Sequence, residues 1–170
     1  LPIHEAISIG APYEVIDILA RGYPDGLARK ELVIKRLPLH IATRRTPLDE
    51  KVILMLVKYY KDAVAEPDKT GKTPFHYAFM YKASPLVIKK MLEAKPNVAK
   101  AQDRQGFTPV HLACRYGYPT KLIHALLELN PNAAIMTTAE GQTPLQYLQQ
   151  ANPVNVEEAS NLLRRYALQA

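Results

Sequence analysis

The stretch DRQGFTPVHLAC, from Asp103 to Cys114, decides the fold of this chain. Its first four residues are typical of a tight turn, in which Gly106 supplies a positive φ angle. Thr108 and Pro109 follow, and Thr is a favourable N-cap while Pro is tolerated in the first helical turn. The stretch therefore predicts a turn that leads directly into a helix.

The helix start recurs at a fixed period along the whole chain. Its copies are Leu1-Pro2-Ile3-His4, Leu37-Pro38-Leu39-His40, Thr73-Pro74-Phe75-His76, Thr108-Pro109-Val110-His111 and Thr143-Pro144-Leu145-Gln146. The prolines follow one another at intervals of 35 or 36 residues. An apolar pair keeps the same period, at Leu19-Ala20, Met55-Leu56, Met91-Leu92, Leu126-Leu127 and Leu162-Leu163. Two independent anchors with one period predict about five repeats, approximately 1-35, 36-71, 72-106, 107-141 and 142-170.

Each repeat reads as two short helices joined by a polar turn. A small residue recurs two places after the His position, where it allows neighbouring first helices to approach closely, at Ala6, Ala42, Ala78 and Ala113. Turns containing Gly or Pro follow, among them Gly117-Tyr118-Pro119 and Asn152-Pro153. An amphipathic segment such as Thr120 to Leu129 then predicts the second helix.

These residues resemble the ankyrin-repeat family, whose signature is a Thr-Pro-Leu-His-x-Ala helix start preceded by a turn that ends in Gly. The resemblance spans nearly all of the chain and implies an all-α, ankyrin-type solenoid of about five helix-turn-helix repeats with short hairpin-like tips. We expect a single domain over 1-170 that is a piece of a longer chain. The outer side of the fifth helix pair is polar, as in a capping repeat.

Three features depart from the family pattern. The period exceeds the usual 33 residues, and the extra residues fall in the turn between the helices and in the loop after the second helix. The segment Arg29 to Arg36, RKELVIKR, lacks the turn Gly, and Gln146 stands in place of a His.

Composition favours a folded domain in a reducing compartment. Hydrophobic residues make up 48% of the chain, which is enough for a continuous core. The single cysteine cannot form an internal disulfide, and the longest apolar run, Val52 to Val57, is far shorter than a membrane span. We expect an intracellular protein, cytoplasmic or nuclear, with no membrane span.

The residues capable of chemistry do not form a catalytic or metal-binding pattern. His4, His40, His76 and His111 recur once per repeat, and the ankyrin resemblance implies that each bonds backbone groups and ties neighbouring repeats together. His124, with Glu128 one turn later, fits a solvated helix face. Cys114 follows the small Ala113, which favours a buried, inert thiol. Phosphate-binding, zinc-protease and nucleophile-elbow motifs are absent from the sequence, so we expect no enzyme activity, no cofactor and no metal.

We therefore expect the function of this chain to depend on a binding surface. In the ankyrin family the tips and the C-terminal ends of the first helices form a concave face that commonly binds proteins. The basic, aromatic and Met residues that the register places there are Arg44, Arg45, Lys69, Lys72, Met80, Tyr81, Arg104, Phe107, Arg115 and Tyr116. Arg, Tyr, Phe and Met are enriched at interfaces. Alternatively, the arginines only solubilise the helix ends and complement their dipoles.

We therefore expect a protein-interaction scaffold that binds an acidic or mixed acidic-apolar segment of another protein. The net charge of +6 favours such partners. An alternative is binding of an anionic ligand, such as nucleic acid or a phospholipid headgroup, by the same basic residues. With 22 basic and 16 acidic residues the charge is mixed, which makes nucleic acid the weaker alternative.

Overall fold

The structure, a computed structural model, describes residues 1–151 and 156–169. In those residues the chain forms five pairs of α-helices and four 3-10 helices, and no strand. The predicted turn at Asn152-Pro153 lies outside the described residues. None of the described helices has both the length and the apolar character needed to cross a membrane. The chain divides into two compact units, Leu1–Lys95 and Pro96–Ala170, and we describe each by itself.

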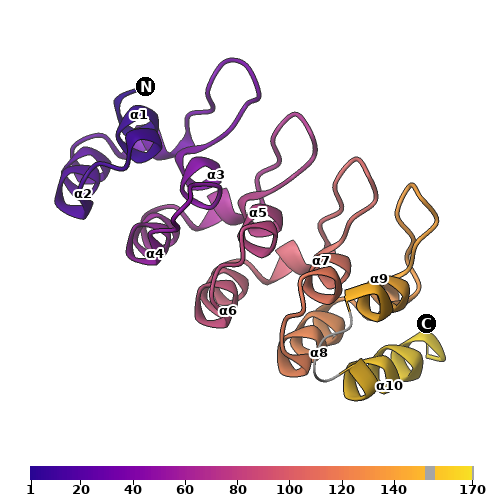
Figure 1. The fold of residues 1–170 in the computed structure, drawn as a ribbon. Helices are drawn as coiled ribbons and strands as arrows, with labels where there is room; N and C mark the ends of the chain where they lie inside the picture. The colour runs from indigo at the N-terminus through magenta and orange to yellow at the C-terminus, as the bar shows by residue number, and fades with distance from the viewer. Residues whose placement is uncertain (152–155, 170) are drawn as a thin grey trace. The chain divides into compact units, whose positions relative to one another are not determined.

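The first unit contains three helix pairs arranged in two rows. Its helices are α1 (Pro2–Ile9), α2 (Tyr13–Gly22), α3 (Pro38–Ala42), α4 (Glu50–Tyr59), α5 (Pro74–Met80) and α6 (Pro85–Ala94), with the 3-10 helices η1 (Pro24–Ala28) and η2 (Lys61–Ala65). The first helices α1, α3 and α5 form one row, and the second helices α2, α4 and α6 form the other (Figure 1). The loop that precedes α3 and the loop that precedes α5 project from the row of first helices as tips (Figure 1).

The second unit repeats the arrangement with two helix pairs. Its elements are η3 (Pro96–Lys100), α7 (Pro109–Arg115), α8 (Thr120–Leu129), η4 (Pro131–Ala134), α9 (Pro144–Ala151) and α10 (Val156–Ala167). Helix α7 packs against α9, and α8 packs against α10. The five predicted helix pairs are thus present, and the all-helical, ankyrin-type fold class is confirmed.

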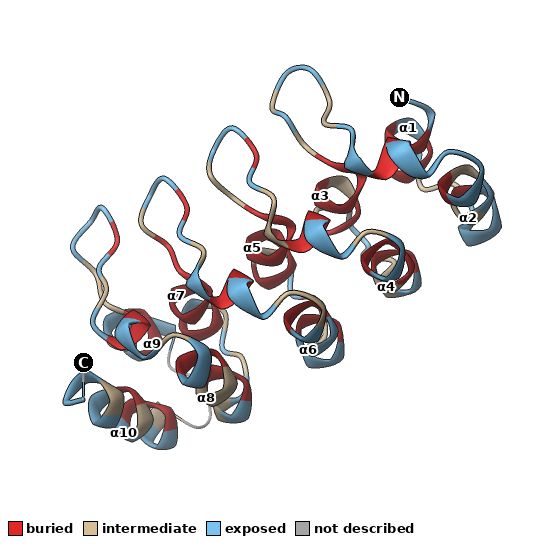
Figure 2. Cartoon of the chain, turned by 180° about the vertical axis from the view of Figure 1, so that it is seen from behind, coloured by how far each residue is buried: buried red, intermediate tan, exposed pale blue. Residues whose placement is uncertain are grey.

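The core follows the two anchors of the repeat. The second residue of each apolar pair is buried, at Ala20, Leu56, Leu92, Leu127 and Leu163. The small residues of the first helices are also buried, at Ala6, Ala42, Ala78 and Ala113. Within each unit the buried surface of the second helices faces the first helices, while their opposite side is exposed (Figure 2).

The helix starts have the predicted caps. In α5 the Thr73 hydroxyl lies 3.4 Å from the His76 backbone N–H, which donates to it, and the His76 ring accepts from the Thr73 backbone N–H. The same reciprocal pair forms between Thr108 and His111 at the start of α7. The Thr-Pro-x-His sequence thus satisfies orphan amide groups of the first turn with side chains three residues apart.

The extra residues after the second helix are part of the core. In each of the first four repeats they form a short 3-10 helix that buries a pair of small or apolar residues. These pairs are Gly26-Leu27, Ala63-Val64, Val98-Ala99 and Ala133-Ala134. The loop after the second helix therefore contributes buried residues in each of these four repeats.

The tips are tight turns closed by backbone hydrogen bonds. In the tip before α5, the Asp68 carboxylate accepts from the Thr70 and Lys72 amides, and Gly71 has a φ of 80°. The segment Arg29 to Arg36 makes the equivalent turn without a Gly. There Glu31 accepts from three backbone amides, and Lys35 takes the left-handed φ of 62°.

Candidate functional site

We define the inner surface of each unit as its tips together with the C-terminal ends of its first helices. In the first unit it contains the predicted site residues Arg44, Arg45, Lys69, Lys72, Met80 and Tyr81. In the second unit it contains Arg104, Phe107, Arg115 and Tyr116. All ten lie on or beside these elements, but their exposure differs.

In the first unit the structure brings Arg44 onto an aromatic ring. Its guanidinium carbon lies 5.2 Å from the ring centroid of Tyr77, a residue of α5. Arg36 approaches the same ring at 5.7 Å, and the ring of Tyr81 lies 6.4 Å from that of Tyr77. The Tyr77 hydroxyl donates to the buried Asp68 carboxylate at 2.7 Å. Tyr77 therefore joins a tip, the end of one first helix and the middle of the next.

Asp68 is held in its charged form at the base of this cluster. Burial alone would raise the pKa of its carboxyl, but hydrogen bonds from Thr70 and Tyr77 outweigh burial and lower the pKa. The Nε atom of Arg36 lies 3.5 Å from the carboxylate. Asp68 therefore has Arg36 as its cationic partner. Among the described residues, no carboxylate lies within salt-bridge distance of Arg44.

The other predicted residues of the first unit lie around this cluster. Lys69 is exposed, and its backbone amide donates to Ile34 of the neighbouring tip at 2.9 Å. Lys72, Met80 and Arg45 are partly exposed. The guanidinium of Arg45 donates to the Pro47 carbonyl at 3.4 Å. Arg45 is therefore separate from the Arg44 cluster.

In the second unit Arg115 lies over two aromatic rings at once. Its guanidinium carbon is 5.5 Å from the ring centroids of both Phe107 and Tyr147, and those rings are 5.3 Å apart. Arg115 is exposed, and the Tyr147 hydroxyl lies 3.5 Å from a Glu140 carboxylate oxygen. The arrangement presents a flat guanidinium on an aromatic platform.

Phe107 is a part of this platform and does not itself form the exposed surface. Only 8% of the residue is accessible, because its ring packs against Tyr147 and the ring of His111. Arg104, at the tip, is exposed and Tyr116 is partly exposed. The accessible part of this inner surface therefore includes Arg115, Arg104 and Tyr116, and Phe107 lies beneath Arg115.

The sequence reasoning missed the tyrosines on which the arginines stack. Tyr77 and Tyr147 each stand three residues after the helix-start proline. Arg44 and Arg115 each stand six residues after the helix-start proline of their own repeat, which is the repeat before that of the tyrosine. The equal spacing in two repeat pairs was a usable signal, since a contact between adjacent repeats recurs between the same two register positions.

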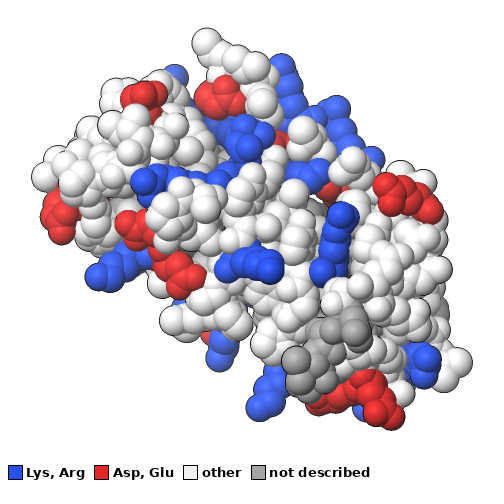
Figure 3. All heavy atoms as spheres, in the orientation of Figure 1, with Lys and Arg blue, Asp and Glu red and all other residues white. Residues whose placement is uncertain are grey.

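The charge on the inner surfaces is mainly positive. In the described part of the chain, neither Arg44 nor Arg115 has a carboxylate within salt-bridge distance. The Nε atom of Arg44 is buried without a hydrogen-bond partner. Figure 3 shows Lys and Arg side chains scattered over a largely uncharged face, with Asp and Glu side chains also present on it.

The periodic histidines have structural roles in backbone bonding. The Nδ1 atom of His40 accepts from the Leu37 amide at 3.0 Å, so the ring proton lies on Nε2, which donates to the Lys72 carbonyl at 3.2 Å. His4 bonds the Arg36 carbonyl and His111 the Gln142 carbonyl in the same way, both at 3.2 Å. The predicted ties between repeats are thus confirmed for these three. Burial lowers the pKa of all three rings, and that of His40 falls to about 4.

The two remaining side chains considered for chemistry are Cys114, which is buried, and His124, which is partly exposed to solvent. Cys114 is fully buried, and burial raises the pKa of its thiol to about 12, which leaves it in the unreactive thiol form. His124 is partly exposed, and its Nδ1 atom lies 3.6 Å from a Glu128 oxygen. Both placements agree with the sequence interpretation.

Comparison with known proteins supports the family. A family model described as ankyrin repeat matches residues 105–135, which cover part of the tip before α7, then α7, α8 and η4. No curated protein matches the chain. The matched segment includes Phe107, Arg115 and Tyr116.

Proposed function

We propose that the inner surfaces bind an acidic or mixed acidic-apolar segment of another protein, because an ankyrin-repeat family model matches residues 105–135 and ankyrin repeats generally mediate protein–protein interaction. Arg44 and Tyr81 would be the contacts in the first unit, and Arg115 and Tyr116 those in the second. The lysines of the tips would add long-range attraction, which raises the rate of encounter with an acidic partner.

The observation that carries the proposal is the pair of aromatic-stacked guanidinium groups that have no acidic partner among the described residues. Arg44 on Tyr77, and Arg115 on Phe107 and Tyr147, are held in place by rings at 5.2 to 5.5 Å. A guanidinium offers two parallel donors to a carboxylate, and stacking on a ring leaves those edge donors free. A carboxylate of the partner would complete each group.

The test compares charge reversals on and off the inner surfaces. Partners captured from cell extract with the intact chain are identified, and their affinity is measured by titration calorimetry. The triple variant Arg44→Glu, Tyr81→Ala and Arg115→Glu should lose the interaction, since one interface anchor is commonly worth about 2 kcal/mol, or about thirtyfold in affinity. The control Lys100→Glu with Lys121→Glu reverses two exposed lysines elsewhere and should bind normally.

A circular-dichroism melt separates binding from folding. Arg115 is exposed, so Arg115→Glu alone should leave the melt nearly unchanged while it weakens binding. If the triple variant and the control bind equally well, the inner surfaces are not the site. If Arg115→Glu lowers the melting temperature as far as a core substitution does, the residue belongs to the fold.

The alternative, an anionic polymer or lipid headgroup, is distinguished by salt. Contacts to a polyanion release counterions and weaken steeply as salt rises, whereas guanidinium groups stacked on rings retain much of their affinity. We therefore expect less than a tenfold loss of partner affinity between about 50 and 200 mM salt, below the loss of about 10³-fold typical of several phosphate contacts.

A further inference from the structure

We propose that the outer side of the first unit, formed by α2, α4 and α6, is a second binding surface that takes a single helix of a partner protein, with large apolar residues seven positions apart and acidic residues between them. This surface lies on the second helices, opposite the inner surface of the same unit. It does not depend on the function proposed above.

Two adjacent apolar grooves form the surface. The groove between α4 and α6 has a volume of about 390 Å³ and includes Leu54, Val57, Leu86 and Ala94. The groove between α2 and α4 has a volume of about 360 Å³ and includes Tyr13, Leu54, Met55 and Tyr59. Leu54 and Lys58 line both grooves, so α4 forms a ridge between them.

Large apolar side chains remain exposed on this side. Leu86 is 57% exposed at the edge of one groove, and Tyr13 and Tyr59 are 37% and 40% exposed at the other. Ile18, on α2, is 64% exposed. Several exposed apolar residues beside hollows of this size are typical of a surface that receives side chains of a partner.

The positive charge of the surface favours an acidic partner helix. Lys51, Lys58 and Lys61 line the grooves, and in the described residues none of them has an ion-pair partner. Among the lining residues Glu93 is the one acid, and it pairs with Lys90 at 2.9 Å.

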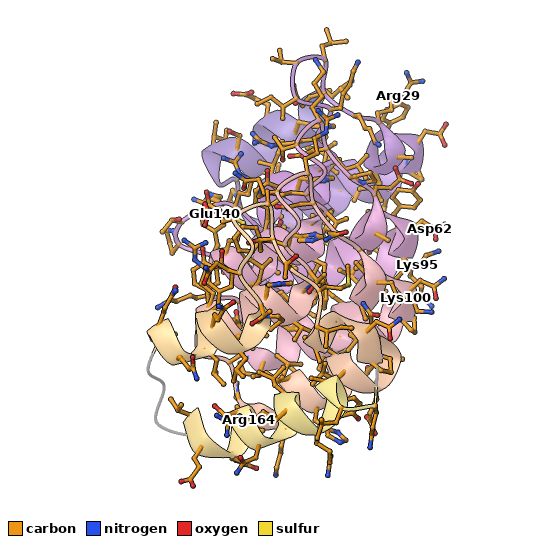
Figure 4. All side chains as sticks on the ribbon, turned by 90° about the vertical axis from the view of Figure 1, so that its right-hand side faces the viewer. Arg29, Asp62, Lys95, Lys100, Glu140 and Arg164 are labelled. Atoms are coloured by element: carbon orange, nitrogen blue, oxygen red, sulfur yellow. The ribbon has the colours of Figure 1, made fainter. Side chains whose placement is uncertain are left out.

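Nearby carboxylates are already engaged. Asp17 accepts from Tyr59 and Arg21, and Glu50 accepts from the amide and hydroxyl of Ser84. Asp62 pairs with Lys95, and Figure 4 shows the two side chains together at the edge of the unit. In the described residues, none of these acids forms an ion pair with Lys51, Lys58 or Lys61.

The distance between the two grooves determines how far apart the large apolar residues of the partner helix, its anchors, must be. Packed helices lie about 8 to 10 Å apart, so grooves on the two sides of α4 are separated by a similar distance. A helix rises about 1.5 Å per residue, so positions seven apart are about 10.5 Å apart and point to the same side. Acidic residues at the third or fourth position between the anchors would then lie over Lys58. Hollows of this kind fit projecting side chains, which favours a partner helix over a flat lipid surface.

The probe is a capped synthetic helix of Ala, Lys and Glu with two Leu residues seven positions apart and Glu at the two central positions. A control peptide of equal composition has one Leu moved to the opposite side of the helix. Binding to the intact chain is followed by fluorescence anisotropy. The patterned peptide should bind at least about tenfold more tightly than the control, because only its anchors reach both grooves.

Variants of the chain locate the peptide. Leu86→Glu and Lys58→Glu should each weaken binding at least about tenfold, whereas Lys121→Glu, an equal charge change at an exposed lysine of the second unit, should alter it less than twofold. Lys58→Ala, in case Lys58→Glu disturbs α4, should weaken binding in the same direction.

Three results would overturn the proposal. The first is equal affinity for the patterned and control peptides. The second is loss of binding with Arg115→Glu but not with Leu86→Glu, which would assign the peptide to an inner surface. The third is binding of phosphatidylserine vesicles that depends on Lys58 while the peptide does not bind, which would indicate a lipid surface instead.

Discussion

Replacing His40 with Gln should make the chain less stable at pH 7 and more stable at pH 4. His40 is fully buried, and its Nδ1 atom accepts a backbone N–H while Nε2 donates to the Lys72 carbonyl. A second ring proton would face the Leu37 amide proton. Burial therefore lowers the pKa of His40 from 6.5 to about 4.

The sign and size of the pH effect follow from linkage. Above pH 6.5 the ring is neutral in both the folded and the unfolded state, and its contribution to stability is fully present. Between pH 6.5 and about 4 the unfolded state takes up a proton that the folded state does not, so stability falls as pH falls. One pKa unit corresponds to about 1.4 kcal/mol, which gives a loss of about 3 kcal/mol at pH 4.

A Gln at position 40 has no titratable group, but its side chain can still make one of the two hydrogen bonds that the His40 ring makes. Gln146 occupies the equivalent place in the fifth repeat, where its carbonyl oxygen accepts from the Thr143 amide at 2.7 Å. The variant His40→Gln loses mainly the bond to Lys72, which should cost about 1 kcal/mol at pH 7. Its stability should then fall about 3 kcal/mol less than that of the wild type on acidification.

Urea melts followed by circular dichroism at several pH values between 4 and 7 measure the difference. The two stability curves should cross between pH 6 and 4, because the titration of every other group is common to both proteins. Parallel curves would refute the reasoning, since they would mean that His40 is protonated equally in the folded and unfolded states. A variant that is already unfolded at pH 7 would show that the Lys72 bond holds the repeats together more strongly than a single hydrogen bond.

Three further predictions concern the fold. Leu127→Ala, at a fully buried site, should cost about 2 to 5 kcal/mol in a denaturant melt, and a loss below about 1 kcal/mol would contradict the assigned core register. Gly10→Ala should cost about 1 to 2 kcal/mol, because Gly10 has a φ of 75° and an added methyl would meet the Arg45 side chain; an unchanged melt would show that this turn relaxes freely. Cys114 should resist thiol reagents at pH 8 in the native chain and react once urea unfolds it, so rapid native labelling would count against its burial.

The repeat and its core could be predicted because particular residue types recur at a fixed interval along the sequence. Pro109 and His111 mark the helix start, and Leu127 marks the core of the second helix. Each of these residues acts within its own repeat or on a fixed register position next to it, as His111 does on Gln142. A periodic pattern therefore contains nearly all the information that such contacts need.

The structural features that the sequence did not predict depend on residue types that have no strong preference for one structure. The buried 3-10 helices use small pairs such as Ala63-Val64, which have no strong sequence signal of their own. The first tip closes through Glu31 and a left-handed Lys35, where the sequence pattern led us to look for Gly. Phe107 was expected on the binding surface, but its ring is buried, because periodicity gives the position of a residue and not the direction of its side chain.

Under the proposed function, the stacked arginines would contribute more to recognition than they can to stability. A guanidinium over an aromatic ring at an exposed site is worth about 0.5 to 1 kcal/mol, much less than the burial of one core leucine. The rings nevertheless restrict Arg115 and Arg44 before a partner arrives, and ordering a long side chain on binding would otherwise cost about 0.5 to 1.5 kcal/mol. The tyrosines beneath them are fixed by contacts that the fold makes in any case, such as the bond from Tyr77 to Asp68. The fold thus supplies rigid platforms, and the arginines on them can receive carboxylates at little further entropic cost.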